Sequence, residues 1–202
     1  MSEEASVAEV GELYSPAARA IQDRFDSRRL ADRLAEITVH DALEPAEQAF
    51  IERASFFYLA TVDDDGWPDV SYKGGAPGFV RALDGRTLVF PSYDGNGMFR
   101  SMGNIAATAR VGLLFMQFDP GRRVRVQGTA SLHDDAELME MFPESQLVVR
   151  VAIGRIFPNC PRYVHDLASG EISEFVPQPG RKTPVPEWKT WDLFADALPK
   201  ES

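Results

Sequence analysis

The residue types that best fit a chemical role lie in a glycine-rich turn running into an amphipathic segment, residues 94–104, DGNGMFRSMGN. We predict that a helix begins in this turn with Asn96 as its N-cap. Helical spacing then sorts the side chains onto two faces. The apolar face carries Met98, Phe99, Met102, Ile105 and Ala106, and the other carries Gly97, Arg100, Ser101 and Asn104.

The second face suits a terminal phosphate. Small and hydroxyl residues let an anion approach closely, the guanidinium of Arg100 supplies a planar charged fork, and a helix start presents N–H groups that favour negative charge. A solvated helix face behind a glycine-rich cap would have the same spacing. Spacing alone therefore leaves both interpretations open.

Polar residues on a predicted strand, DVSYKGG, could add to such a site. Alternation places Ser71 and Lys73 on one face, and Val70 and Tyr72 on the other. Lys73 is a candidate for a further positive charge or for a hydrogen bond to a ligand. It fits a solvated lysine on an edge strand equally well.

Two further segments could line the same cleft. In GRRVRVQG, alternation puts Arg123, Arg125 and Gln127 on one side of a strand. Arg123 is the stronger ligand candidate, because Arg125 fits a solvated outer face. Pro91 and Ser92 end the strand before the glycine-rich turn.

The sequence indicates neither a catalytic triad nor a metal site, and it leaves any catalytic residue unknown. His40, His133 and His165 are scattered, and no serine or cysteine lies in a recognisable activation motif. The single cysteine, Cys160, is typical of a small buried hydrophobic residue more than of a reactive thiol.

Composition narrows the class of protein. At 202 residues we expect one domain, residues 1–202, and the net charge of −10 makes nucleic acid and anionic membrane surfaces poor partners. A lone cysteine excludes an intrachain disulfide, and no apolar stretch reaches the length of a membrane span. The start of the chain lacks the pattern of a signal peptide. We therefore expect a soluble, cytoplasmic protein.

The order of predicted elements favours an antiparallel barrel. A helical segment covers about residues 15–53, and from Ser55 the period changes to that of strands joined by short turns, with one inserted helix at about 97–108. A meander of about six strands closes more readily into a barrel than into a parallel sheet. The proline-rich tail, about residues 176–202, is predicted to be extended, with Trp188, Trp191 and Phe194 as anchors.

From about Phe50 to Arg162 the chain resembles the pyridoxamine 5′-phosphate oxidase-like, FMN-binding split-barrel family. The blocks that carry the resemblance, in order, are FFYLATVDDDGWPDVSYKGG, LVFPSYDGNGMFRSMGNI and ARVGLLFMQFDPGRRVRVQGTASL. The resemblance implies a mainly β fold, a six-stranded antiparallel split barrel with flanking helices. It also implies a homodimer with FMN held at the subunit interface.

The family's phosphate-binding pair falls on Arg100 and Ser101, with a serine where the oxidases have lysine. Another phosphate-binding arginine position falls near Ser71, and a glutamine position falls on Arg123. The tail lacks the oxidases' Arg-Leu-His type of substrate signature, so the resemblance implies a subgroup other than the oxidase proper. The candidate cofactor-binding residues are Ser71, Tyr72, Lys73, Pro91, Ser92, Asn96, Gly97, Arg100, Ser101, Asn104 and Arg123.

The resemblance leads us to expect an FMN-dependent oxidoreductase acting on a small-molecule redox substrate, in which the cofactor carries the chemistry and the protein supplies binding and electrostatics. One alternative is a non-catalytic flavin-binding or sensor protein. Another is a relative that binds the deazaflavin F420 or haem. Fold alone does not name a substrate.

Overall fold

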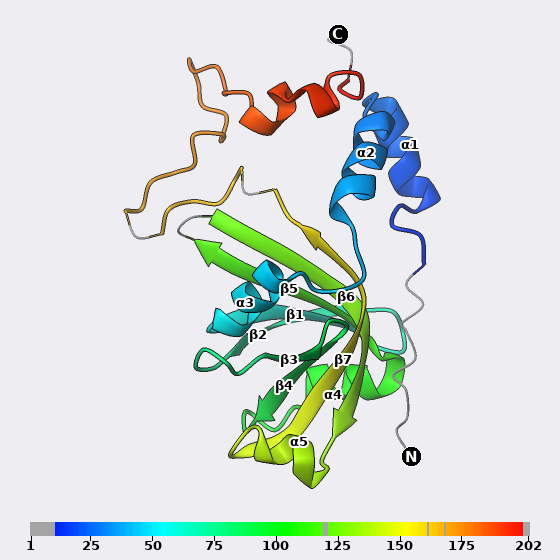
Figure 1. Cartoon of the computed structure of the whole chain (residues 1–202), viewed down its shortest axis with the longest axis vertical. Coiled ribbons are helices and arrows are strands. Elements are labelled where there is room, and N and C mark those ends of the chain that lie inside the picture. The colour runs from blue at the N-terminus through cyan, green and yellow to red at the C-terminus, as the bar shows by residue number, and fades with distance from the viewer. Residues whose placement is uncertain (1–10, 119–120, 161, 168, 200–202) are drawn as a thin grey trace. The chain divides into compact units, whose positions relative to one another are not determined.

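The computed structural model describes residues 11–118, 121–160, 162–167 and 169–199, and it contains an antiparallel sheet of seven strands (Figure 1). The hydrogen-bond order is β2-β1-β5-β6-β7-β4-β3. The strands are β1 (Phe56–Val62), β2 (Pro68–Gly74), β3 (Arg81–Asp84), β4 (Thr87–Tyr93), β5 (Arg110–Phe118), β6 (Gly121–His133) and β7 (Ser145–Pro158). The predicted mainly β, split-barrel class is confirmed. The count is seven rather than six, because the short β3 pairs with the edge of β4.

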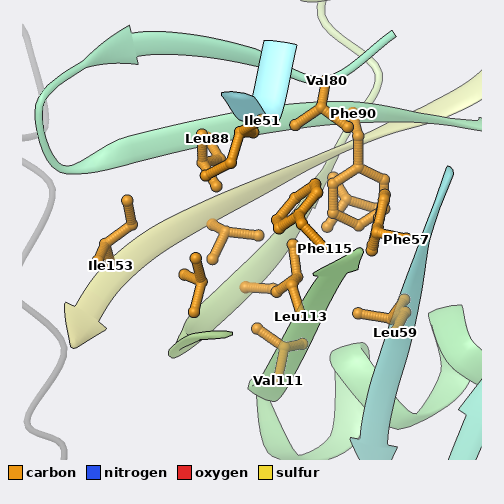
Figure 2. Close-up of a cluster of buried hydrophobic side chains, with 14 of the residues drawn as sticks. Ile51, Phe57, Leu59, Val80, Leu88, Phe90, Val111, Leu113, Phe115 and Ile153 are labelled. Carbon is orange, nitrogen blue, oxygen red and sulfur yellow. The ribbon is translucent and has the colours of Figure 1, made fainter. Parts of the chain in front are cut away.

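Aromatic contacts indicate that the sheet curls upon itself. Three strands separate β1 from β4 in hydrogen-bond order, yet the ring centroids of Phe57 on β1 and Phe90 on β4 lie 5.0 Å apart. Phe115 on β5 lies 5.1 Å from Phe57, and Figure 2 shows the three rings gathered in one cluster. A flat sheet would hold strands so far apart in order much farther apart in space. The inner faces of the strands therefore enclose a single core.

A β-bulge in β6 helps this curvature. The register between β6 and β7 shifts between Gln127 and Gly128. A Cβ atom at Gly128 would lie 2.0 Å from the carbonyl oxygen of Ala152, so only glycine allows the two backbones to approach this closely.

Three short helices lie between His40 and Asn159, the part of the chain that contains the sheet. They are α3 (Pro45–Arg53), α4 (Arg100–Thr108) and α5 (Ala136–Glu140). A capping box between Glu44 and Glu47 begins α3, which buries Phe50 and Ile51 in the core. The side chain of Asp135 caps α5 by accepting a hydrogen bond from the N–H of Leu138.

The chain separates into two compact units. The barrel unit contains His40–Gln117 and Arg123–Asn159, and the second unit contains Gly11–Val39, Phe118–Arg122 and Cys160–Ser202. The prediction that the whole chain is one domain stays a prediction. No helix among the described residues is both long enough and apolar enough to span a bilayer.

Helices α1 (Pro16–Arg24) and α2 (Arg28–Thr38) form one part of the second unit, and the 3-10 turns η1 (Glu187–Thr190) and η2 (Asp192–Phe194) form another. Arg33 joins the two parts, because its guanidinium donates to the backbone oxygen of Leu193 and to both carboxylate oxygens of Asp196. Phe194 is buried and lies against Trp188. The tail, predicted to be extended, is therefore partly helical and is held within this unit.

Candidate functional site

A pocket of about 380 Å³ lies in the barrel unit, among β2, the end of β4 and the start of α4. This volume is within the usual range for small-molecule sites. The predicted site residues that line it are Ser71, Lys73, Ser92, Asn96, Gly97, Arg100 and Ser101. Two strands and a helix thus bring together residues that are separate in the sequence.

The glycine-rich turn leads into α4 differently from the prediction. The Oδ1 atom of Asn96 accepts a hydrogen bond from the N–H of Met98 at 3.0 Å, so its side chain closes a local turn. The helix begins at Arg100, and its N-cap is Phe99 in the left-handed conformation with φ 48°. The predicted N-cap at Asn96 is therefore wrong, since the N-cap lies three residues later. The left-handed backbone of Phe99 cannot belong to a right-handed helix, so the helix starts only after it.

The start of α4 presents unsatisfied backbone donors. Phe99 makes no side-chain capping bond, and the first bond of the helix runs from Gly103 N–H to Phe99 oxygen at 2.7 Å. The N–H groups of the residues between them have no acceptor within the helix. Those residues, Arg100, Ser101 and Met102, all line the pocket. The positive end of the helix dipole therefore lies at the pocket wall.

A pair of hydroxyl groups lies beside these donors. The Oγ atoms of Ser71 on β2 and Ser101 on α4 are 3.0 Å apart, which is hydrogen-bonding distance. Ser101 is buried at 6% exposure, whereas Ser71 is half-buried. Each hydroxyl can donate and accept. One of the two can therefore accept a hydrogen bond from the other and still donate its own proton to a bound anion.

Lys73 and Arg100 give the pocket its positive charge. Within the described residues, neither side chain makes a hydrogen bond or an ion pair, and Asp69 is the one carboxylate in the pocket lining. Burial lowers the pKa of Lys73, and the nearby Asp69 partly opposes this shift. An ammonium ion that is partly removed from water and makes no ion pair is stabilised by an incoming anion.

Helix α4 is fixed to the barrel by buried polar contacts. Asn104 is 7% exposed, and its side-chain amide donates to the hydroxyl of Thr61 on β1 at 3.0 Å. The hydroxyl of Thr108 donates to the backbone oxygen of Val62 at 2.8 Å. Asn104, a predicted ligand residue, therefore lies outside the pocket lining and holds the helix in place.

Three other predicted residues also lie outside the lining. Tyr72 is on the opposite face of β2, stacked on Phe56 with ring centroids 5.3 Å apart. Pro91 is buried within β4. Arg123 lies on β6, where its backbone oxygen accepts a hydrogen bond from Asn159.

Sequence reasoning missed part of the lining. Helical spacing assigned Met98 and Phe99 to the apolar face of the helix, but they are 65% and 49% exposed and line the pocket. Gln146 comes from β7 and binds Asp94 at 3.1 Å. Helical spacing misplaced the first two, because the helix starts after them. Gln146 has no local signal, since only the strand order brings it near.

A family model described as pyridoxamine 5′-phosphate oxidase matches residues 43–161, more than half of the chain. No curated protein matches the chain. Similar solved structures include a candidate pyridoxamine 5′-phosphate oxidase from Lactobacillus delbrueckii, with 25% identity and a TM-score of 0.48, covering 60% of this chain and 99% of that chain. The haem storage protein HutZ from Vibrio cholerae has 17% identity and a TM-score of 0.42, covering 58% and 95%. An FMN-binding protein from Syntrophomonas wolfei has 12% identity and a TM-score of 0.44, covering 71% and 95%.

Proposed function

The chain belongs to the pyridoxamine 5′-phosphate oxidase family, and we propose that it binds FMN in the α4 pocket and acts as an FMN-dependent oxidoreductase. The observation that carries the proposal is the pair of cations, Lys73 and Arg100, that line a pocket and make no hydrogen bond or ion pair among the described residues. In a chain of net charge −10, such a pair is best explained by a negatively charged ligand.

The start of α4 fits the phosphate of FMN. Arg100 would supply a charge-assisted hydrogen bond, and the first N–H groups of the helix would supply further donors. The hydroxyls of Ser71 and Ser101, 3.0 Å apart, would complete the set of donors on the side of β2. This donor set suits a phosphate monoester more than an uncharged ligand.

FMN, when bound, would supply the transfer of electrons, because its ring system accepts and donates them. Lys73 would contribute a hydrogen bond and positive charge near the pyrimidine edge of the ring. Asp69 would help keep this lysine protonated, since it favours the charged form. The exposed side chains of Met98 and Phe99 would cover apolar surface at the pocket wall.

A homodimer is part of the proposal. The outer faces of β1 and β2 carry an aromatic cluster of Phe56, Tyr58 and Tyr72, whose ring centroids lie 5.3 to 6.1 Å apart. Tyr72 is 61% exposed, and Val70 beside it is 65% exposed. Contiguous exposed apolar surface of this kind is typical of an interface. We propose that a second copy of the chain covers it, with the flavin at the subunit interface.

The test is to purify the protein, record its visible absorption spectrum, and identify by mass any chromophore released by heat. A yellow protein that releases FMN supports the proposal, and turnover with a reduced nicotinamide and an acceptor separates an oxidoreductase from a non-catalytic flavin binder. A Soret band, or a deazaflavin mass, would point to the haem or F420 alternative. A colourless protein that does not bind added FMN contradicts the proposed site.

A further inference from the structure

Three polar residues on the outer surface of the barrel unit lie in contact at the end of β6. The Oγ atom of Ser131 is 2.8 Å from Nε2 of His133. The other ring nitrogen of this histidine, Nδ1, is 3.5 Å from Oδ2 of Asp135. The order of groups is hydroxyl, imidazole and carboxylate, which is the arrangement that activates a serine as a nucleophile. None of the three lines the α4 pocket.

Local structure accounts for this arrangement. Ser131 and His133 are two positions apart on β6, so both side chains project from the same face of the strand. Asp135 follows the strand and is fixed as the N-cap of α5, where Oδ1 accepts from the N–H of Leu138 at 3.2 Å. One carboxylate oxygen therefore holds the cap and the other faces the histidine.

The carboxylate also selects the useful form of the imidazole. A proton on Nδ1 is favoured when this nitrogen faces Asp135, and Nε2 is then an acceptor for the hydroxyl proton of Ser131. The 3.5 Å between Nδ1 and Oδ2 is longer than a normal hydrogen bond but short enough for the carboxylate to attract the N–H of the imidazole.

Positive charge lies across the strand pair from the serine. Ser131 and Arg150 on β7 are directly opposed in register, so their side chains share one face of the sheet. Arg150 is half-buried, and it makes no hydrogen bond or ion pair within the described residues. A guanidinium in this position can stabilise negative charge that develops on a carbonyl oxygen near Ser131.

We propose that Ser131, His133 and Asp135 form a second catalytic site, which hydrolyses small activated carboxylic esters. Ser131 Oγ bonds to the ester carbonyl carbon while its proton passes to His133 Nε2. The bond from this carbon to the alcohol oxygen then breaks, and the departing alkoxide takes the proton from His133. Water attacks the acyl group and gives its proton to His133, which returns it to Ser131 as the carboxylic acid leaves.

A fluorophosphonate probe tests the serine directly, because this reagent bonds to activated serine oxygens. We expect one phosphonyl adduct on the full chain, at Ser131 by peptide mass mapping, and release of p-nitrophenol from p-nitrophenyl acetate. His133→Ala should slow the labelling of Ser131 about a hundredfold, the usual contribution of a general base. Asp135→Asn should slow it about tenfold, since asparagine keeps the cap of α5 but removes the charge.

Ser169→Ala is the matched control. Ser169 is an exposed serine whose hydroxyl bonds to a carboxylate, that of Asp166, with no histidine in between. The Ser169→Ala protein should be labelled by the fluorophosphonate and should hydrolyse p-nitrophenyl acetate at the rates of the unchanged chain. The Ser131→Ala protein should show neither labelling nor hydrolysis. Labelling at another residue, an unchanged rate in His133→Ala, or no adduct at all would overturn the proposal. None of these results bears on FMN binding, so the two proposals fail separately.

Discussion

The hydroxyl oxygens of Ser71 and Ser101 lie 3.0 Å apart, although 30 residues separate them in the chain. One belongs to an edge strand of the sheet and the other to the first turn of α4. Their contact thus joins two of the elements that line the pocket. It depends on the position of α4, which the bond from Asn104 to Thr61 fixes against β1.

The first prediction concerns this serine pair. Ser101→Ala should weaken FMN binding two- to tenfold, the value of one neutral hydrogen bond of about 0.5–1.5 kcal/mol. Ser71→Ala should do the same, and the double variant should cost less than the sum of the two, because the hydroxyls share a network. Fluorescence titration with FMN measures all four affinities. Strict additivity would indicate that the two serines act independently.

A larger effect is expected at Arg100. Arg100→Ala should weaken FMN binding by about 1.5–3 kcal/mol, or roughly 10- to 150-fold, because a charge-assisted hydrogen bond to phosphate is lost. Arg110→Ala is a suitable control, since this arginine is exposed and outside the pocket lining. Riboflavin, which lacks the phosphate, should bind Arg100→Ala and the unchanged chain equally. Unchanged FMN affinity in Arg100→Ala would rule out our assignment of the phosphate site.

Lys73 should make the stability of the FMN-free protein depend on pH. Burial lowers its pKa in the folded state, so between the folded and unfolded pKa values the unfolded chain binds more protons and stability rises with pH. Below both pKa values, the full free-energy cost of burying the charged form of Lys73 is present. Lys73→Met should therefore be the more stable protein at neutral pH, and its advantage should shrink in alkaline solution.

Urea unfolding at several pH values measures this difference, with Lys182→Met as the control for an exposed lysine. The other charged side chains that line the pocket are those of Asp69 and Arg100, and they are unchanged in the Lys73→Met protein. A gap between the two proteins that does not vary with pH would contradict the prediction.

The aromatic cluster on β1 and β2 predicts the effect of a charge at the proposed interface. Tyr72→Asp should shift the protein from dimer to monomer in light-scattering measurements, because an unpaired carboxylate would be buried against the second copy. Leu83→Asp, at an exposed apolar position on β3, should leave the dimer intact. A Tyr72→Asp protein that remains fully dimeric would place the interface elsewhere.

Backbone strain at the end of α4 offers a stability test. Ala109 is the C-cap and has φ 57°, a left-handed conformation that costs a residue with a side chain about 1–2 kcal/mol. Ala109→Gly should raise the free energy of unfolding by about 1 kcal/mol. Ala106→Gly, on the exposed face of the same helix, should lower it by a similar amount. Equal effects of the two substitutions would show that the cap conformation is not strained.

Much of the barrel was predictable because its strands alternate. FFYLATV buries every second residue as β1, and the same rule put Ser71 and Lys73 together on β2. What alternation could not give is the left-handed residue Phe99, which moves the start of α4, or the arrival of Gln146 from β7. The first depends on one local dihedral angle and the second on the order of strands. Neither can be predicted from the alternation of apolar and polar residues.

The site that we propose at Ser131 was not predicted from the sequence, for a different reason. The spacing Ser-x-His-x-Asp is visible in the sequence, and alternation on β6 predicts a shared face for the first two residues. The position of Asp135, beyond the strand, depends on the cap of α5. A search for known sequence motifs of activated serines overlooks these three residues, because their arrangement depends on where β6 ends.

The backbone bridge between His40 and Ile156 affects the entropic cost of the contact between the segments that carry Arg33 and Asp196. The two residues exchange both backbone hydrogen bonds, so the barrel holds the start and end of its own segment side by side. The contact of Arg33 with Asp196 closes a loop of 163 residues in an unfolded chain. Once the barrel has formed, the same contact closes a loop several times shorter, and each halving of length removes about 0.6 kcal/mol of loop-closure entropy. The two segments that Arg33 and Asp196 join therefore meet at a lower entropic cost once the barrel is complete, and a substitution that unfolds the barrel weakens their contact.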